Sequence, residues 1–160
     1  MELQEQLKNE AINLGACDDG ISSWGNPDVN ELCRKYFKYQ DFCIEHDFPS
    51  LEEFNAAGKD SVESNGIFFD GNGNCCNMPH VAVIGNANVD VHVIKPCNIT
   101  VRHKGRVNVY VENNVLCYIS MHDACKVNIV SKHPNGRVCV SYWSGEIENK
   151  EMIDKIYTKS

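Results

Sequence analysis

The sequence predicts an α+β protein in which a helical region, residues 1–70, is followed by a small β-solenoid. Apolar residues recur at helical spacing in the first half and alternate with polar residues in the second half. The alternating runs also repeat in pairs, which is what successive coils of a solenoid require. An antiparallel β meander or sandwich produces the same alternation and is the alternative fold.

The composition is that of a soluble globular protein. Hydrophobic residues make up 42% and charged residues 23% of the 160 residues, which excludes disordered and fibrous classes. No apolar run reaches the length of a membrane span, and the charged N-terminus lacks the apolar core of a signal peptide. The nine cysteines are therefore expected to be reduced thiols of a cytoplasmic protein that is not bound to a membrane.

Charge is divided unevenly along the chain. Residues 1–70 carry fifteen Asp and Glu against five Lys and Arg, whereas residues 71–160 carry seven against ten. Nucleic-acid binding is not expected, because its affinity comes largely from cations that displace counterions from phosphates. The basic cluster from Arg102 to Arg106 is interpreted as a charged strand edge that discourages aggregation.

The helical region is predicted to contain three helices. The apolar residues of the first helix recur at helical spacing, and Gly15 is placed to cap its C-terminus; they are Leu3, Leu7, Ala11, Ile12 and Leu14. A loop rich in Gly, Asn, Ser and Pro follows, and a second helix is expected from about Asp28 to His46. The acidic charge argues against DNA binding by these helices, so a helical cap or docking module is the simpler interpretation.

Three local features of the helical region carry specific expectations. Cys33 and Cys43 lie in the apolar stripe of the second helix, so both are expected to be small buried hydrophobic residues. Phe48-Pro49 ends that helix. Ser50 and Glu53 then have the spacing of a capping box, which predicts the start of a short third helix.

The second half contains six short alternating runs whose starts lie 10, 8, 10, 10 and 11 residues apart. Every second run is similar: Val89-Asp90-Val91 is echoed by Val107-Asn108-Val109 and by Val127-Asn128-Ile129. The interleaved set leads from Ile99 to Cys117 to Val138. These echoes predict about three two-stranded coils over residues 71–144, with Asp90, Asn108 and Asn128 in one outward polar column.

The ends of the solenoid need cover. Residues 145–160 are expected to form a helix capped by Asn149, with a further strand as the alternative. The helical region is expected to cover one end of the thin core and self-association the other end. A homo-oligomer is therefore predicted, with a trimer as the first candidate.

No metal or cofactor is expected. Cys75 and Cys76 are adjacent and cannot easily chelate one ion together, so they and His80 do not form a convincing zinc site. Residues 70–74 begin like a calcium loop but lack its glycine at the sixth position, and Val81 stands where the acidic twelfth ligand belongs. We interpret this segment as a tight turn.

Four residues form the candidate binding patch. In the proposed register His103 lies in line with Tyr142, with His122 one position aside and Arg102 adjacent. Arg102 has the geometry to hold a phosphate or carboxylate, and His103 and His122 are weak candidates for acid–base catalysis. In the competing interpretation, all four residues are simply outward-facing polar positions of a solvated sheet. We favour this interpretation, and the chain has no nucleophile motif and no phosphate-binding glycine loop.

Several segments resemble one family. The runs LGACDDG, WGNP, DFCIEHDFPS, NGIFFD and VRHKGRVNVYV are similar to segments of uncharacterised small proteins from bacteriophages and integrated mobile elements of Bacteroides and related gut bacteria. The similarity covers most of the chain in the same order. The resemblance implies a phage-borne protein that acts in the host cytoplasm or is packaged with the virion, and it implies no catalytic residues.

Three classes of function remain. The favoured class is a non-enzymatic binding or assembly module that engages a host or phage protein, since repeat architectures serve as rigid display surfaces. The second is an inhibitor whose acidic half occupies a basic site on a host defence or nucleic-acid-binding protein. The third is a small hydrolase or nucleotide-binding protein centred on Arg102 and His103.

Overall fold

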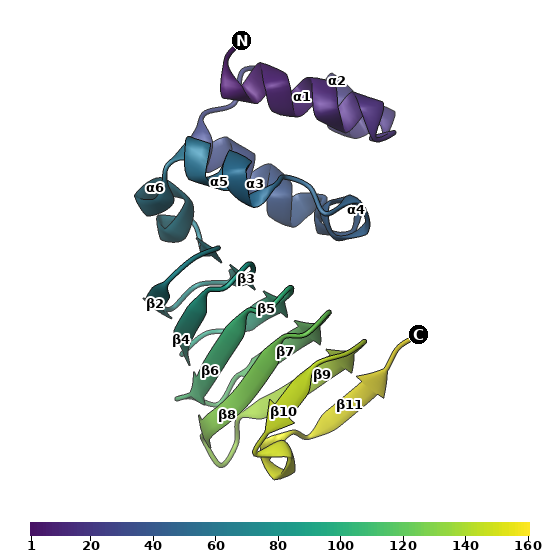
Figure 1. Cartoon of the computed structure of the whole chain (residues 1–160). Coiled ribbons are helices and arrows are strands. Elements are labelled where there is room, and N and C mark those ends of the chain that lie inside the picture. Colours follow the sequence, from purple (N-terminus) through teal and green to yellow (C-terminus); the bar gives the residue numbers. More distant parts are fainter. The chain divides into compact units, whose positions relative to one another are not determined.

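The computed structural model describes all residues, 1–160, and divides them into two compact units, Met1–Asn65 and Gly66–Ser160. The first unit is helical and the second is a solenoid of parallel strands (Figure 1). The boundary falls before residue 70 because the first strand of the solenoid already begins at Ile67. None of the helices combines the length and the apolar character needed to cross a membrane.

The helical unit contains six short helices rather than three. They are α1 (Leu3–Asn13), α2 (Asp18–Ser22), α3 (Val29–Lys38), α4 (Gln40–His46), α5 (Leu51–Ala57) and α6 (Lys59–Ser64). The second predicted helix is divided because Tyr39, at φ −111° and ψ 33°, leaves the helical conformation. The predicted loop contains α2, where Cys17 accepts a hydrogen bond from the N–H of Gly20 and so caps the helix N-terminus.

The local expectations for the helical unit are confirmed. Cys33 and Cys43 are both buried. The capping box is complete: Ser50 Oγ accepts a hydrogen bond from the N–H of Glu53 at 3.2 Å, and Glu53 Oε1 accepts one from the N–H of Ser50 at 2.9 Å. This arrangement fixes the Glu53 side chain on the first turn of α5.

The second unit is a solenoid of about five coils. Its strands are β1 (Ile67–Phe68), β2 (Asn72–Cys76), β3 (His80–Val83), β4 (Asn88–Val93), β5 (Cys97–Val101), β6 (Arg106–Val111), β7 (Leu116–Met121), β8 (Lys126–Lys132), β9 (Arg137–Tyr142), β10 (Glu146–Glu148) and β11 (Lys155–Thr158). One sheet has the order β1-β3-β5-β7-β9-β11 and the other β10-β8-β6-β4-β2, with every pair parallel. The solenoid prediction is confirmed, because an antiparallel meander has no such pairs.

The predicted number of coils, about three, is wrong. The first coil was missed because β1 has only two residues and β2 reads NGNCC, which does not alternate apolar and polar side chains. Strand β3 reads HVAV, a continuous apolar run after its first residue, so it also lacks the period-two signal. The end coils of the solenoid thus depart from the pattern that reveals the central ones.

One of the two predicted registers is confirmed and the other is shifted at its first step. Asp90 pairs with Asn108 and Asn108 with Asn128, as predicted, and Asn108 Nδ2 donates a hydrogen bond to Asp90 Oδ1 at 2.9 Å. In the other sheet Ile99 pairs with Ile119 rather than with Cys117, so the first predicted step is wrong, whereas Cys117 pairs with Val138 as predicted. Because side chains alternate with period two, a slip of two residues keeps the same face inward, so alternation alone could not detect it.

The last segment forms strands, so the expected helix in residues 145–160 is wrong. Asn149 has a left-handed conformation with φ 59° and leads into a single 3₁₀ turn, Lys150–Met152, between β10 and β11. Strand β11 pairs with β9 and extends its sheet by one strand. Met152, Ile153 and Ile156 pack against the solenoid core, so the chain itself contributes apolar cover to the last coil. The homo-oligomer stays a prediction.

Candidate functional site

The structure brings together only part of the patch predicted from the sequence. The backbone N–H of His122 donates to Val101 O and that of Trp143 to Met121 O, so Arg102, His122 and Trp143 occupy one position in successive coils. His103 lies instead beside Asp123, whose Oδ2 accepts a hydrogen bond from the His103 N–H at 3.0 Å. The expected alignment of His103 with Tyr142 is therefore wrong, and its cause is the same two-residue register slip.

Arg102 and His103 have structural surroundings. Arg102 is 4% exposed, so it is not a surface residue open to a phosphate or carboxylate. His103 has a left-handed conformation at φ 56°, and its Nδ1 accepts a hydrogen bond from the Gly85 N–H at 3.0 Å. Gly85 and Asp123 are left-handed as well, at φ 60° and 61°. These three residues form one corner of the solenoid, stacked from coil to coil.

His122 and Tyr142 contact neighbouring residues of the same sheet region. His122 Nε2 lies 2.7 Å from Ser120 Oγ, and its ring stacks on Trp143 with centroids 5.8 Å apart. The Tyr142 hydroxyl donates a hydrogen bond to the carbonyl oxygen of Gly145 at 2.9 Å. Sequence reasoning missed Ser120 because the Ser120–His122 pair joins the last part of β7 to the residue after it, and no sequence motif marks such a contact.

The cysteine pair is divided between two sides of a sheet. Cys75 is buried in the solenoid core and Cys76 is exposed, because consecutive residues of a strand face opposite sides. Burial raises the pKa of the Cys75 thiol to about 12. No group of three or more His, Cys, Asp and Glu side chains is placed to hold a metal ion.

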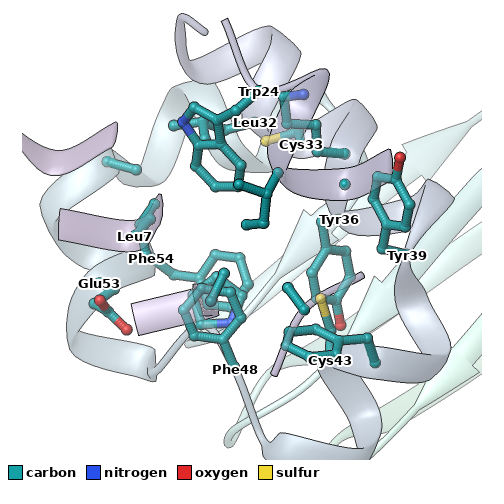
Figure 2. Close-up of a pocket in the computed structure, with 18 of the residues that line it drawn as sticks. Leu7, Trp24, Leu32, Cys33, Tyr36, Tyr39, Cys43, Phe48, Glu53 and Phe54 are labelled. Atoms are coloured by element: carbon teal, nitrogen blue, oxygen red, sulfur yellow. The ribbon is translucent and has the colours of Figure 1, made fainter. Parts of the chain in front are cut away.

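The helical unit contains an apolar cavity that the sequence did not reveal. Its volume is about 260 Å³, and it lies among α1, α2, α3, α4 and α5. In Figure 1, α1 and α2 form one layer of this unit and α3, α4 and α5 the other. Figure 2 shows Trp24 on one side of the cavity and Phe48 and Phe54 on the other. We call this cavity the helical groove.

The walls of the helical groove follow from the apolar faces of the helices. On α1, Leu7 and Ala11 are spaced by four residues and share one face, which is buried. On α3, Tyr36 is buried and meets Phe54 of α5 edge to face, with ring centroids 5.6 Å apart. Such aromatic contacts hold one wall rigid. The opposite wall includes α1, which packs against α2 and α5.

A few polar groups border the helical groove. Tyr39 OH donates a hydrogen bond to Asp19 Oδ2 at 2.8 Å, and Lys35 Nζ donates to the carbonyl oxygen of Ser23 at 3.1 Å. The indole Nε1 of Trp24 is buried without a hydrogen-bond partner. A buried donor in this state costs about 1–3 kcal/mol, which an occupant with an acceptor atom would recover.

Two carboxylates stand at one edge of the helical groove. Glu53 lines the groove, and it is 8% exposed. Gln6 Nε2 lies 3.4 Å from both Glu53 Oε2 and Glu10 Oε1, so it bridges the two acids. Burial raises the pKa of the Glu10 carboxyl, and Glu53 raises it further through a hydrogen bond and its charge. Two acidic side chains therefore interact directly at this edge of the groove.

The apolar residues of the first helix do not share one fate. Leu7 and Ala11 are buried and line the groove, whereas Ile12 and Leu14 are 48% and 37% exposed. The spacing of these residues in the sequence does not indicate a cavity beside them.

Comparison with known proteins found no matching family model, no matching curated protein and no matching solved structure.

Proposed function

We propose that the chain is a non-enzymatic binding module whose helical unit takes apolar side chains of a partner protein into the helical groove. The observation that carries this proposal is the groove itself, a cavity of about 260 Å³ with a wall of aromatic and aliphatic side chains. Cavities with apolar and aromatic walls and a few polar groups are the usual form of a binding site. The solenoid, with its continuous aliphatic core, serves as the rigid part of the molecule.

A segment of a partner protein fits this site better than a small molecule. Ile12 and Leu14 are exposed and lie in the chain between Ala11 and Gly15, which both line the groove. A small apolar molecule would fill the cavity and leave these two side chains in water. An amphipathic helix that inserts anchors spaced by three and four residues would cover both the groove and its border.

The partner is a host or phage protein, as the family resemblance implies, and the encounter takes place in the host cytoplasm or in the virion. The inhibitor version of the proposal is a special case in which the partner is a host defence protein. In both versions binding needs no chemical step, so no residue is assigned a catalytic role.

Tryptophan fluorescence tests the proposal directly. The chain has two tryptophans, so Trp143→Phe leaves Trp24 in the groove wall as the only one. We expect an amphipathic helical peptide with leucine anchors to change the Trp24 emission in a saturable way. Saturation by lauric acid but not by the peptide would show a small-molecule site and contradict the proposal. An unchanged emission with both probes would also contradict it.

A further inference from the structure

We propose that the segment held in the helical groove is basic, and that a lysine or arginine next to its apolar anchors pairs with Glu53 and Glu10. This inference rests on the proposed function and specifies the chemistry of the partner. It requires an acidic edge that is continuous with the groove, carboxylates without a cation of their own, and a chain whose field attracts a basic partner.

Glu53 connects the acidic edge to the groove. Its side chain lines the cavity, and Figure 2 shows its carboxylate at the border of the apolar space, near Phe54 and Leu7. One carboxylate oxygen is committed to the Ser50 N–H at 2.9 Å. The other oxygen lies 3.4 Å from the neutral amide of Gln6, and the Glu53 carboxyl also hydrogen-bonds with the carboxyl of Glu10. A carboxylate this deeply buried is stabilised by a cation, and the groove is the open side from which a cation can come.

The protein supplies no cation here. The ion pairs of the helical unit lie elsewhere, for example between Lys59 and Glu63, and none involves Glu10 or Glu53. Lys35, which also lines the groove, is held by the carbonyl oxygen of Ser23. The carboxyls of Glu10 on α1 and Glu53 on α5 therefore meet each other, through a direct hydrogen bond and through Gln6. A cation placed at this edge would relieve the repulsion between the two acids.

The shape of the site favours lysine or arginine over a free ion. Both side chains have an aliphatic stem that packs along apolar surface while the charged end reaches a polar edge. The groove offers the apolar surface and Glu53 the edge. A bare metal ion would need more oxygen or nitrogen ligands than two carboxylates, and no such group of side chains is present.

The net charge of the whole helical unit also favours a basic partner. Residues 1–65 carry fourteen Asp and Glu against five Lys and Arg, a net charge of −9. A field of this sign raises the local concentration of basic segments and speeds their association. Acidic or neutral amphipathic segments gain nothing from it. The partner is thus identified by its chemistry as a basic amphipathic segment of a protein.

The test uses the full-length Trp143→Phe protein and three synthetic amphipathic peptides. The peptides share their leucine anchors and differ at one position beside them, which holds lysine, glutamine or glutamate. Trp24 emission reports binding. We expect the lysine peptide to bind about tenfold more tightly than the glutamine peptide and the glutamate peptide to bind most weakly.

Variants that lack the two carboxylates test whether Glu10 and Glu53 cause the preference for the lysine peptide. Glu53→Gln keeps the capping box, since glutamine also serves at this position of the motif. We expect the combined Glu10→Gln and Glu53→Gln variant to bind the lysine and glutamine peptides with affinities that differ less than twofold. The combined Glu5→Gln and Glu52→Gln variant is the matched control, because both residues are exposed acids on α1 and α5 and their loss removes the same two charges. This control should keep the tenfold preference.

Two results would overturn the inference without touching the proposed function. The first is equal binding of the lysine and glutamine peptides to the Trp143→Phe protein. The second is an equal loss of preference in the control variant (Glu5→Gln with Glu52→Gln) and in the Glu10→Gln, Glu53→Gln variant, which would show a general charge effect rather than a paired cation. Failure of all three peptides to change the emission of folded protein would instead contradict the proposed function.

Discussion

Nδ1 of His103 accepts a hydrogen bond from the backbone N–H of Gly85 at 3.0 Å, one coil earlier in the solenoid. The next coil continues the contact, because the His103 N–H donates to Asp123 Oδ2. The corner is therefore held by side chains that satisfy backbone groups of neighbouring coils. These two hydrogen bonds give His103 a structural role in the solenoid, so a catalytic role is not needed to explain it.

Replacing His103 should lower stability and leave binding intact. We expect His103→Ala to reduce the free energy of unfolding by about 1 kcal/mol, since it leaves the Gly85 N–H without its acceptor. Urea unfolding followed by circular dichroism measures this loss. His103→Asn should cost less, because asparagine tolerates the left-handed conformation better than alanine. The corner would not depend on His103 if the alanine variant were as stable as the parent protein.

The polar column on the second sheet gives a second stability prediction. Asn108 Nδ2 donates to Asp90 Oδ1, so Asn108→Ala should lower the free energy of unfolding by about 0.5–1.5 kcal/mol. Asn108→Asp should cost more at pH 7, because it places two like charges opposite one another on adjacent strands. Urea titrations at pH 7 and pH 4 compare the variants. Equal stability of Asn108→Asp at the two pH values, relative to the parent, would contradict the assigned contact.

The contacts of Asp154 predict that the stability contributed by the last coil depends on pH. Its Oδ2 accepts hydrogen bonds from the Val138 N–H at 2.8 Å and from Lys132 Nζ at 3.0 Å, and these contacts lower the pKa of the carboxyl. The folded state therefore holds the proton less readily than the unfolded state. The stabilisation is complete above the ordinary pKa of about 3.9 and is lost as pH falls through the lowered one. Asp154→Asn should thus destabilise the protein at pH 7 and progressively less below pH 4.

Thermal unfolding from pH 2 to pH 7 measures the Asp154 effect. The difference in melting temperature between the parent and Asp154→Asn should shrink toward low pH. Glu151→Gln is a suitable control, since Glu151 is an exposed acid of the same segment. A difference that stayed constant over this range would mean that the carboxylate contributes nothing through its charge.

The nine cysteines should react unequally with Ellman's reagent. Cys17 and Cys76 are exposed, Cys139 is half-buried and the other six are buried. Burial raises the pKa of the Cys33 and Cys125 thiols to about 11 and that of Cys97 to about 12, so these thiols stay protonated at neutral pH. We expect two fast thiols in the folded protein and nine after unfolding. Rapid reaction of all nine without denaturant would contradict the packed solenoid core.

The sequence predicts the solenoid because its central coils repeat. Val89, Val107 and Val127 are buried at equivalent positions of three successive coils. Burial of one face of each strand imposes both the alternation of apolar and polar residues and the spacing between coils. The end coils escape prediction for a physical reason. Strands β1 and β10 have only two and three residues, and so few positions cannot establish a period.

The helical groove could not be predicted, because it depends on tertiary packing. Helical spacing reveals which face of a helix is apolar, and it correctly identified Leu7 and Ala11 as buried. It does not reveal how closely α1 approaches α3 and α5, which decides whether those faces meet or leave a space. The exposure of Ile12 and Leu14 becomes interpretable only when the neighbouring helices are in place.

The most direct test of the helical groove fills it. Ala57 of α5 lines the cavity, whereas the adjacent Ala56 is exposed on the same helix and does not. Ala57→Phe and Ala56→Phe can be compared in the Trp143→Phe protein by calorimetric titration with the lysine peptide, after circular dichroism has shown that both are folded. Binding through the groove predicts at least an order-of-magnitude loss of affinity in Ala57→Phe and none in Ala56→Phe. Unchanged affinity in Ala57→Phe would contradict the assignment of the groove as the binding site.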